Sequence, residues 1–228
     1  MRRMHPAPAS AFSDPDMVAR YAEGPLRNVP GYASVLPMTS ILLAERVAAA
    51  GRVLVVGAGG GLELEALAKA HPGWRFDGVD PSAPMLELAA RRLGPLGERV
   101  RLHQGYVQDV PDQAFDAATC LLTFHFVARE ERVPMAAAIH RRLKPGAPFV
   151  AMHLSVEDED GQRAEWLSRY AAFSGQAPGQ AAATREKLER ELSILTPAQD
   201  EAILREAGFT RIRLFYVGFA FRGWVAMA

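Results

Sequence analysis

The sequence predicts a doubly wound α/β fold, in which helices cover both faces of a mostly parallel, Rossmann-like sheet. Between residues 52 and 154, five short runs rich in apolar and β-branched residues alternate with segments whose apolar residues recur at helical spacing. Breaks that contain glycine or proline separate the two kinds of segment. This alternation is typical of βαβ units, whose parallel strands are joined through crossover helices.

The individual elements follow from the same spacing. A first helix is expected from Thr39 or Ser40, either of which could cap it, to Ala49, and Gly51 ends it. Later helices are expected over residues 62–70, 82–93 and 131–143. The strands are expected over residues 52–56, 74–79, 99–103, 115–122 and 147–154.

The pattern changes after the fifth strand. Residues 157–193 are polar with helical spacing, and glycines at 175–179 interrupt them. Thr196-Pro-Ala-Gln199 is typical of a helix start, with a capping box and a proline in the first turn. Two β-rich runs, 210–217 and 219–227, flank Gly218, and so short a connection requires an antiparallel pair.

The length of 228 residues fits one domain with modest additions. We expect an irregular N-terminal arm or lid over residues 1–38, with one short helix around Asp16–Tyr21. The main domain then covers residues 39–228, with a helical insert at about 157–193. The amphipathic insert is a candidate dimer surface.

The composition argues against several classes of protein. The chain has 26 acidic and 26 basic residues, whereas tight binding to nucleic acid requires an excess of basic residues. Arg91-Arg92 and Arg141-Arg142 are candidates for a local basic patch, although solvated helix faces explain them better. No apolar run is long enough to cross a bilayer, and the N-terminus has no secretory pattern, so a cytoplasmic protein is expected.

The cysteine and histidine content predicts no metal site. Cys120 is the single cysteine and lies in an apolar run, which indicates a buried structural thiol. The six histidines form no short ligand spacing, so no bound metal is expected.

A glycine-rich turn between the first strand and the following helix indicates a ligand-binding site. Glycines allow a sharp turn and a close ligand approach, and the helix start presents unpaired N–H groups. The spacing Gly57-x-Gly59-x-Gly61 is one residue shorter than the dinucleotide pattern, and Glu63 and Glu65 follow it. Two carboxylates there would repel a pyrophosphate, so a methionine moiety with an ammonium group fits better.

Asp80 is the second part of this constellation. It lies 19 residues after Gly61, at the end of the second expected strand. An acidic residue at about 20 residues accepts hydrogen bonds from ribose hydroxyls in nucleotide-binding sheets, and it disfavours a 2′-phosphate. Together, the turn and the acid predict an adenosylmethionine site.

Five segments resemble the class I S-adenosylmethionine-dependent methyltransferases. They are Val53-Leu-Val-Val-Gly-Ala-Gly-Gly-Gly61, Gly78-Val-Asp-Pro-Ser-Ala-Pro-Met-Leu86, Phe115-Asp-Ala-Ala-Thr119, Leu143-Lys-Pro-Gly146 and Ala207-Gly-Phe209. The resemblance implies the strand order 3-2-1-4-5-7-6 with the last strand antiparallel. It also implies that the turn, including Ala58, lies under the methionine moiety, that Asp80 holds the ribose, and that Pro81 and Met85 border the adenine.

A narrower resemblance is to the bacterial carboxy-S-adenosylmethionine synthases of wobble-uridine modification in tRNA. Val29-Pro-Gly-Tyr32, the stretch Arg185-x-x-Leu188-Glu189 and the ending 215–225 carry it. It implies that Tyr32 contacts the cofactor and that Arg185 binds the extra carboxylate. The sequence departs from that family at Tyr106, where an acid would meet the adenine, and at Leu121, where an asparagine would stand.

Several residues are weighed individually, and no catalytic residue is assigned. His125 follows the fourth strand and is a candidate base for a hydroxyl or amine, a lining residue or a half-buried structural histidine. Tyr32 could close over a sulfonium. Tyr106 and the adjacent Val107 are expected at the adenine, with a core position as the alternative for the tyrosine, and Arg185 is as well explained as a surface residue.

These observations favour a methyltransferase that uses S-adenosylmethionine, releases S-adenosylhomocysteine and acts on a small-molecule acceptor. The alternative is an enzyme like the carboxy-S-adenosylmethionine synthases. An idle nucleotide-binding or scaffold protein and an NAD-dependent enzyme are the remaining hypotheses. The fold does not identify the acceptor.

Overall fold

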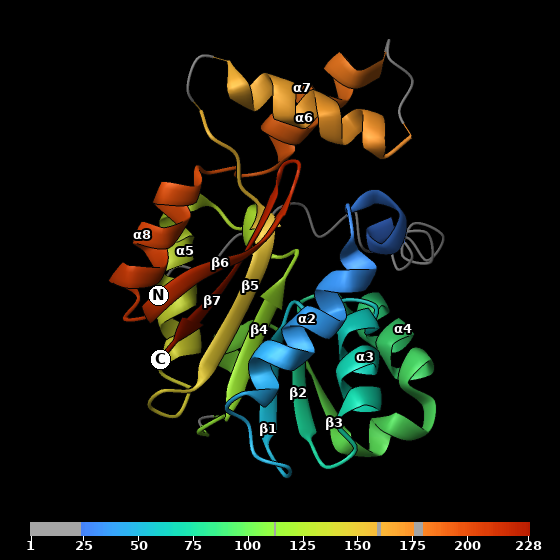
Figure 1. The fold of residues 1–228 in the computed structure, drawn as a ribbon. Helices are drawn as coiled ribbons and strands as arrows, with labels where there is room; N and C mark the ends of the chain where they lie inside the picture. The colour runs from blue at the N-terminus through green and yellow to red at the C-terminus, as the bar shows by residue number, and fades with distance from the viewer. Residues whose placement is uncertain (1–23, 112, 159–160, 176–179) are drawn as a thin grey trace.

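Figure 1 shows a computed structural model of the chain, which describes residues 24–111, 113–158, 161–175 and 180–228. The helix expected around residues 16–21 lies outside this part of the chain.

A seven-stranded sheet runs through the molecule in the order β3-β2-β1-β4-β5-β7-β6. The strands are β1 (Arg52–Val56), β2 (Arg75–Asp80), β3 (Val100–Gln104), β4 (Ala117–Leu121), β5 (Pro148–Leu154), β6 (Thr210–Gly218) and β7 (Phe221–Met227). Strands β1 to β5 pair in parallel, and β7 pairs antiparallel with both β5 and β6. The expected fold class, strand order and antiparallel ending are confirmed.

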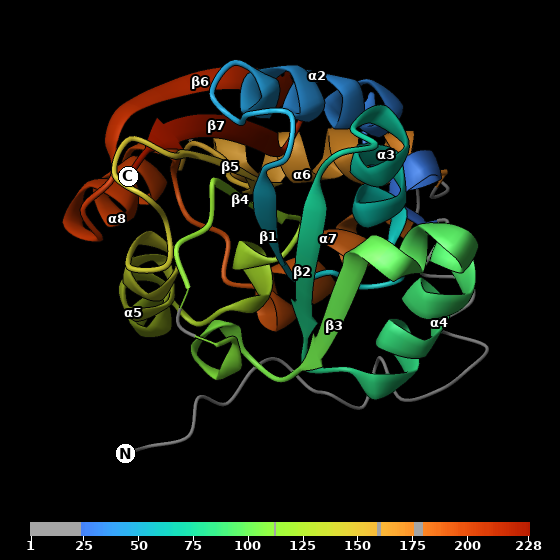
Figure 2. The ribbon, with the colours of Figure 1, turned by 90° about the horizontal axis from the view of Figure 1, so that it is seen from below.

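The helices lie on both faces of this sheet (Figure 2). Their bounds are α2 (Tyr32–Ala44), α3 (Leu62–Ala70), α4 (Ala83–Leu93), α5 (Arg129–His140), α6 (Gln162–Phe173), α7 (Ala181–Glu191) and α8 (Pro197–Glu206). The core on one face joins the sheet to α2, α3 and α4, and the core on the other joins it to α5 and α8. Three short 3-10 turns, η2 (Gly94–Arg99), η3 (Val107–Asp109) and η4 (Phe124–Phe126), complete the described connections.

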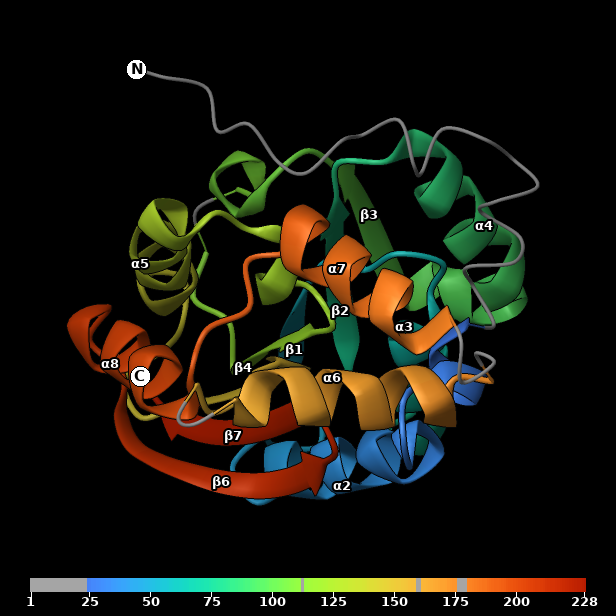
Figure 3. The same cartoon turned by 90° about the horizontal axis from the view of Figure 1, so that it is seen from above.

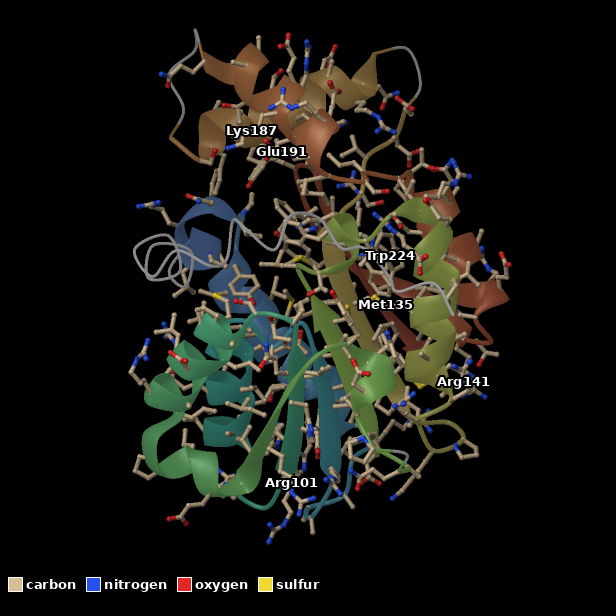
Figure 4. The ribbon with its side chains drawn as sticks, turned by 180° about the vertical axis from the view of Figure 1, so that it is seen from behind. Arg101, Met135, Arg141, Lys187, Glu191 and Trp224 are labelled. Atoms are coloured by element: carbon tan, nitrogen blue, oxygen red, sulfur yellow. The ribbon has the colours of Figure 1, made fainter. Side chains whose placement is uncertain are left out.

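Alternation along the strands explains the two cores. Val53 and Val55 of β1 pack into the α2–α4 core, while Leu54 and Val56 pack into the α5–α8 core, as the two-residue repeat of a strand requires. Figure 4 labels Met135 of α5, which is buried in the second core and also reaches the edge of the sheet where ligands would bind.

The helix starts show where the local sequence alone predicts the structure and where it does not. Ser82 caps α4, and Thr196 forms the expected capping box with Gln199 at the start of α8. The expected start of the first helix at Thr39 or Ser40 is wrong, because α2 begins at Tyr32 and contains Pro37. Gly31 in a left-handed conformation begins it, and Thr39 is fully buried.

Helices α6 and α7 lie beyond the carboxyl edge of the parallel strands, as the view from above shows (Figure 3). Both helices fall within residues 157–193, the range in which a helical insert is expected. Lys187 and Glu191, labelled in Figure 4, belong to α7. Within the described residues, every helix falls short of the length and apolar character that a membrane span needs.

Buried charges in the frame are paired. Arg132 of α5 donates from Nη1 to Asp200 Oδ1 of α8 at 2.6 Å, and His153 Nε2 lies 3.2 Å from the same oxygen. Arg142, one of the residues considered for a basic patch, is buried and donates to the carbonyls of Gln108 and Val110. Arg142 therefore holds the segment that follows α5 against the segment around η3.

Gly61 sets the spacing between α3 and α4. It has φ +82°, and a Cβ added to it would lie 2.9 Å from Ala89 Cα. Gly61→Ala should therefore combine left-handed strain with overpacking and lower the free energy of unfolding by about 2–5 kcal/mol. Urea unfolding followed by circular dichroism measures this loss.

Gly146→Ala is the matched control. Gly146 also has a left-handed φ of +75°, but no atom of the described residues lies within 4 Å of its added Cβ. It should lose only about 1–2 kcal/mol from backbone strain. Equal losses in the two variants would contradict the packing role of Gly61.

Candidate functional site

A cavity of about 400 Å³ opens at the carboxyl edge of the parallel strands. The connections that follow β1, β2, β3 and β4 form most of its wall, as expected for the ligand site of an open α/β sheet. Pro25 and Tyr32 close it from the N-terminal side, and the start of α5 closes it from the other face.

The glycine turn forms the floor of this cavity. Gly57 has φ +76°, and a Cβ added to it would lie 1.9 Å from Thr123 Oγ1 at the end of β4. Only glycine lets the two strand ends approach this closely. The Gly57 and Ala58 N–H groups both donate to the Val79 carbonyl, at 2.9 and 3.0 Å. Arg92 Nε of α4 donates to the Gly60 carbonyl at 2.9 Å, which fixes the turn from outside.

Asp80 links the glycine turn to the helix after β2. Its Oδ2 accepts the Gly59 N–H and its Oδ1 accepts the Ser82 N–H, both at 2.9 Å. Burial raises the pKa of Asp80, and these two backbone donors partly offset the effect. A carboxylate has about four acceptor positions, so two remain for groups in the cavity.

The connection after β3 forms the third wall. Gln104, Gly105, Tyr106 and Val107 line the cavity there, and Asp109 holds the segment by accepting the Tyr106 N–H at 2.8 Å. Burial and the nearby carboxylates of Asp109 and Asp80 raise the pKa of the Tyr106 phenol, which keeps it neutral and able to donate.

Tyr32 is held in the lining by a residue far along the chain. It is the first residue of α2 and only 4% exposed. The Tyr216 hydroxyl of β6 donates to the Pro30 carbonyl, just before the left-handed Gly31. The C-terminal pair of strands therefore positions the start of α2 and its tyrosine.

The end of β4 carries an unusual backbone conformation. Leu122 lines the cavity with φ +57°, a region that a branched side chain seldom occupies. Its N–H donates to the Met152 carbonyl at 2.6 Å, and the Thr123 hydroxyl donates to the Leu121 carbonyl at 3.1 Å. Such conformations are concentrated at functional sites.

Glu63 contributes a buried carboxyl group to the same cavity. It is the second residue of α3 and only 5% exposed, and its Oε1 has no hydrogen-bond partner in the described part of the chain. Burial raises the pKa of Glu63 to about 7, and the neighbouring Thr119 hydroxyl lowers it in part.

The described lining is acidic. Its ionisable groups are the carboxyls of Glu63, Asp80 and Glu131 and the phenols of Tyr32 and Tyr106, and it contains no lysine, arginine or histidine. A ligand with a net positive charge fits such a wall, whereas a phosphate or a second carboxylate would find no cation within the described lining.

The residues expected at the cofactor divide into two groups. Lining the cavity are Tyr32, Gly57, Ala58, Gly59, Asp80, Pro81, Met85, Tyr106, Val107 and Leu121. Gly61 lies outside the lining, where it packs on α4.

The two candidate substrate residues lie outside the described lining. His125 is buried, and its Nδ1 accepts the Leu154 N–H at 3.2 Å. Burial lowers the pKa of His125 well below its usual range, and the charges of His153 and Arg132 add to this. This hydrogen bond ties the ring to β5. Arg185 of α7 has its Nε 3.9 Å from Glu189 Oε2.

The sequence interpretation left two acidic lining residues out of the expected cofactor site, and it considered Glu63 only as a charge that disfavours a pyrophosphate. Glu131, at the start of α5, had no signal beyond its position after β4. Glu63 did have one, because it shares a helical stripe with Leu67, four residues later, and both are buried. Cys120 is fully buried as expected, and burial raises the pKa of its thiol.

The raised pKa of Glu63 predicts a pH dependence of stability. In the unfolded chain the group titrates near 4.5, and in the folded, ligand-free protein near 7. The folded state therefore binds the extra proton between these values, and ionising Glu63 costs stability as the pH rises from about 4.5 to 7. Glu63→Gln should gain roughly 3 kcal/mol over the wild type at pH 8 and little at pH 4.

Urea unfolding of both proteins across this range measures the difference. Glu65→Gln is the contrast, because Lys69 lowers the pKa of Glu65 and the substitution should destabilise at pH 8. An unfolding free-energy difference between Glu63→Gln and the wild type that does not change with pH would contradict the burial argument.

Comparisons with known proteins show what the chain is similar to. Residues 53–146, which run from β1 to the connection before β5, match a family model described as a methyltransferase domain. Among curated proteins, the carboxy-S-adenosyl-L-methionine synthase of Wolinella succinogenes is 27% identical over 207 residues, covering 88% of this chain and 86% of that protein.

Solved structures share the fold across nearly the whole chain. A SAM-dependent methyltransferase from Aquifex aeolicus has a TM-score of 0.64 at 21% identity, covering 94% of this chain and 98% of that one. Human N-acetylserotonin methyltransferase in complex with SAM also has a TM-score of 0.64, at 16% identity. The match covers 94% of this chain and 56% of the human chain.

The resemblance to class I enzymes is thus confirmed in domain and in sheet order. Residues 53–146 match the methyltransferase domain model, and the chain has the fold seen in solved S-adenosylmethionine-dependent methyltransferases.

Proposed function

We propose that the protein is an S-adenosylmethionine-dependent methyltransferase that acts on a small-molecule acceptor. The acidic cavity over the glycine turn carries this proposal. S-adenosylmethionine has a sulfonium, an ammonium and one carboxylate, so its net charge is positive and suits a wall of carboxyls without basic residues. The pyrophosphate of NAD does not suit it.

The residues present fit the parts of this cofactor. The two free acceptor positions of Asp80 suit the ribose hydroxyls. Met85 and the segment 104–107 form an apolar slot for the adenine, and Tyr106 contributes a phenol to it. Tyr32 and the glycine turn would hold the methionine moiety, and the face of a tyrosine attracts a sulfonium.

The cofactor, when bound, supplies a methyl group activated by a positive sulfur. The chain then has to hold the acceptor in line with that methyl, keep water out and take up a proton where the acceptor carries one. Glu131 lines the cavity from α5 and is the candidate proton acceptor, since the described lining has no histidine, lysine or cysteine.

The insert and the N-terminal arm are the proposed source of acceptor selectivity. Pro25 lines the cavity, and α6 and α7 lie beyond the same sheet edge. We also propose a cytoplasmic enzyme without a nucleic-acid partner, which the buried thiol of Cys120 and the charge balance support.

The second candidate is an enzyme like the carboxy-S-adenosylmethionine synthases. Curated relatives with that name at 23–27% identity favour it. An extra carboxylate on the donor would need a cation, for which Arg185 is the candidate. Arg185 Nε is buried and has no hydrogen-bond partner in the described part of the chain, but the residue lies outside the cavity lining.

Native mass spectrometry and calorimetry together distinguish these functions. The proposal expects the purified protein to bind S-adenosylmethionine and S-adenosylhomocysteine with affinities unchanged in Arg185→Ala. Retention of a carboxylated donor that is lost in Arg185→Ala would establish the second candidate. Binding of neither nucleoside would indicate a scaffold, and binding of NADH in its place would indicate a redox enzyme. The same spectrum reports whether the protein is a dimer.

Asp80→Asn tests the ribose contact. An amide has one acceptor oxygen and repels the N–H groups of Gly59 or Ser82, so affinity for S-adenosylhomocysteine should fall about 10- to 100-fold. Calorimetry measures this loss.

Asp116→Asn is the matched control. Asp116 also accepts a backbone N–H, from Arg52 at 2.8 Å, but it lies at the opposite end of the strands. Its variant should keep full affinity even where it lowers stability. Equal affinity losses in both variants would contradict a specific role for Asp80.

A further inference from the structure

The carboxyl of Glu63 is the one ionisable group of the described lining that the proposed contacts leave unused. It projects from the first turn of α3, directly after the glycine turn. The residue is only 5% exposed. Neither Glu63 Oε1 nor Thr119 Oγ1 has an aligned hydrogen-bond partner within the described chain, although the Thr119 hydroxyl lies near enough to lower the pKa of Glu63 in part.

Such an arrangement is costly unless a ligand completes it. Burial of a carboxylate without a partner costs several kcal/mol, and buried charges in proteins are normally paired. The buried carboxylates of the frame follow this rule, since Asp77 pairs with Arg52 and His103, and Asp200 pairs with Arg132. The helix start of α3 favours a negative charge, but it provides Oε1 with no donor.

The partner that Glu63 lacks is a hydrogen-bonding cation. S-adenosylmethionine and S-adenosylhomocysteine share an α-ammonium group, which has three N–H donors. The sulfonium has no N–H, and the carboxylate would be repelled. The ammonium belongs to the methionine moiety, which the proposed function places over the glycine turn beside Glu63.

We propose that Glu63 binds the α-ammonium group of the donor and thereby selects nucleosides that carry an amino-acid moiety. This inference rests on the proposed function. In the ligand-free protein, burial holds the pKa of Glu63 at about 7, so the group is partly protonated at neutral pH. An ammonium beside it stabilises the ionised form, so binding releases a proton, and affinity for the donor rises with pH from about 6 to 8.

Calorimetry with two ligands tests the inference. S-adenosylhomocysteine carries the ammonium, whereas 5′-methylthioadenosine has the same nucleoside without the amino-acid moiety. For the wild type, only S-adenosylhomocysteine should show proton release, measured in buffers of different ionisation enthalpy, and tighter binding at pH 8 than at pH 6.

Glu63→Gln should weaken S-adenosylhomocysteine about 10- to 100-fold at pH 8 and abolish its proton release. Its affinity for 5′-methylthioadenosine should stay within about twofold of the wild type, which excludes a general loss of structure. Glu65→Gln, on the same helix but paired with Lys69 and outside the lining, should match the wild type for both ligands.

Two results would overturn the inference alone: equal weakening of both ligands in Glu63→Gln, or S-adenosylhomocysteine binding that this variant leaves unchanged. Wild-type protein that binds neither ligand would instead overturn the proposed function, and this inference with it.

Discussion

The bridge made by Asp80 is the constraint on which the site depends. One carboxylate accepts an N–H from the glycine turn after β1 and another from the helix start after β2, both at 2.9 Å. Two strand ends are thereby held at a fixed spacing. The turn can reach this position because Gly57 has no Cβ to meet Thr123, and because Gly61 lets α4 pack against the start of α3. Hydrogen bonding and close packing act together at this point.

The buried carboxyl groups of the described chain have two kinds of environment. In the frame, each buried carboxylate has a partner, as in the contact between Arg132 and Asp200 that joins α5 to α8. In the cavity, Glu63 Oε1 has no aligned hydrogen-bond partner among the described residues. Because the other buried carboxylates are paired, the fold can tolerate one buried carboxyl group that lowers its stability. Groups in clefts whose pKa is strongly shifted are characteristic of functional positions. Leu122 in the same lining has a left-handed backbone conformation, whose strain also lowers the stability of the fold.

Most of the fold could be predicted because its signals are local. Strand and helix periods gave the expected bounds of β1 and α3, and the capping residues Ser82 and Thr196 gave the starts of α4 and α8. The start of α2 could not be predicted in this way. Gly31 and Pro37 resemble breaks in the sequence, but tertiary packing makes one a left-handed helix start and accommodates the other within the helix.

The site was less predictable, because side-chain direction depends on packing between distant segments. The position of His125 at the sheet edge follows from the sequence, but the turn of its ring toward β5 does not. Glu63 illustrates the opposite case. It is buried with Leu67 on one stripe of α3, whereas the sequence interpretation considered only its charge beside the glycine turn. Polar residues on an apolar stripe therefore deserve a test as site residues before they are assigned to the surface.

The contact between Tyr216 and Pro30 has a consequence for the order of assembly. It joins two residues that are 186 positions apart, and it fixes the wall that carries Tyr32. During synthesis the glycine turn and Asp80 emerge early, yet this wall is not anchored until β6 has been made and paired. A nascent chain therefore lacks a complete binding site until β6 is in place, so the cofactor would stabilise only chains that include this strand.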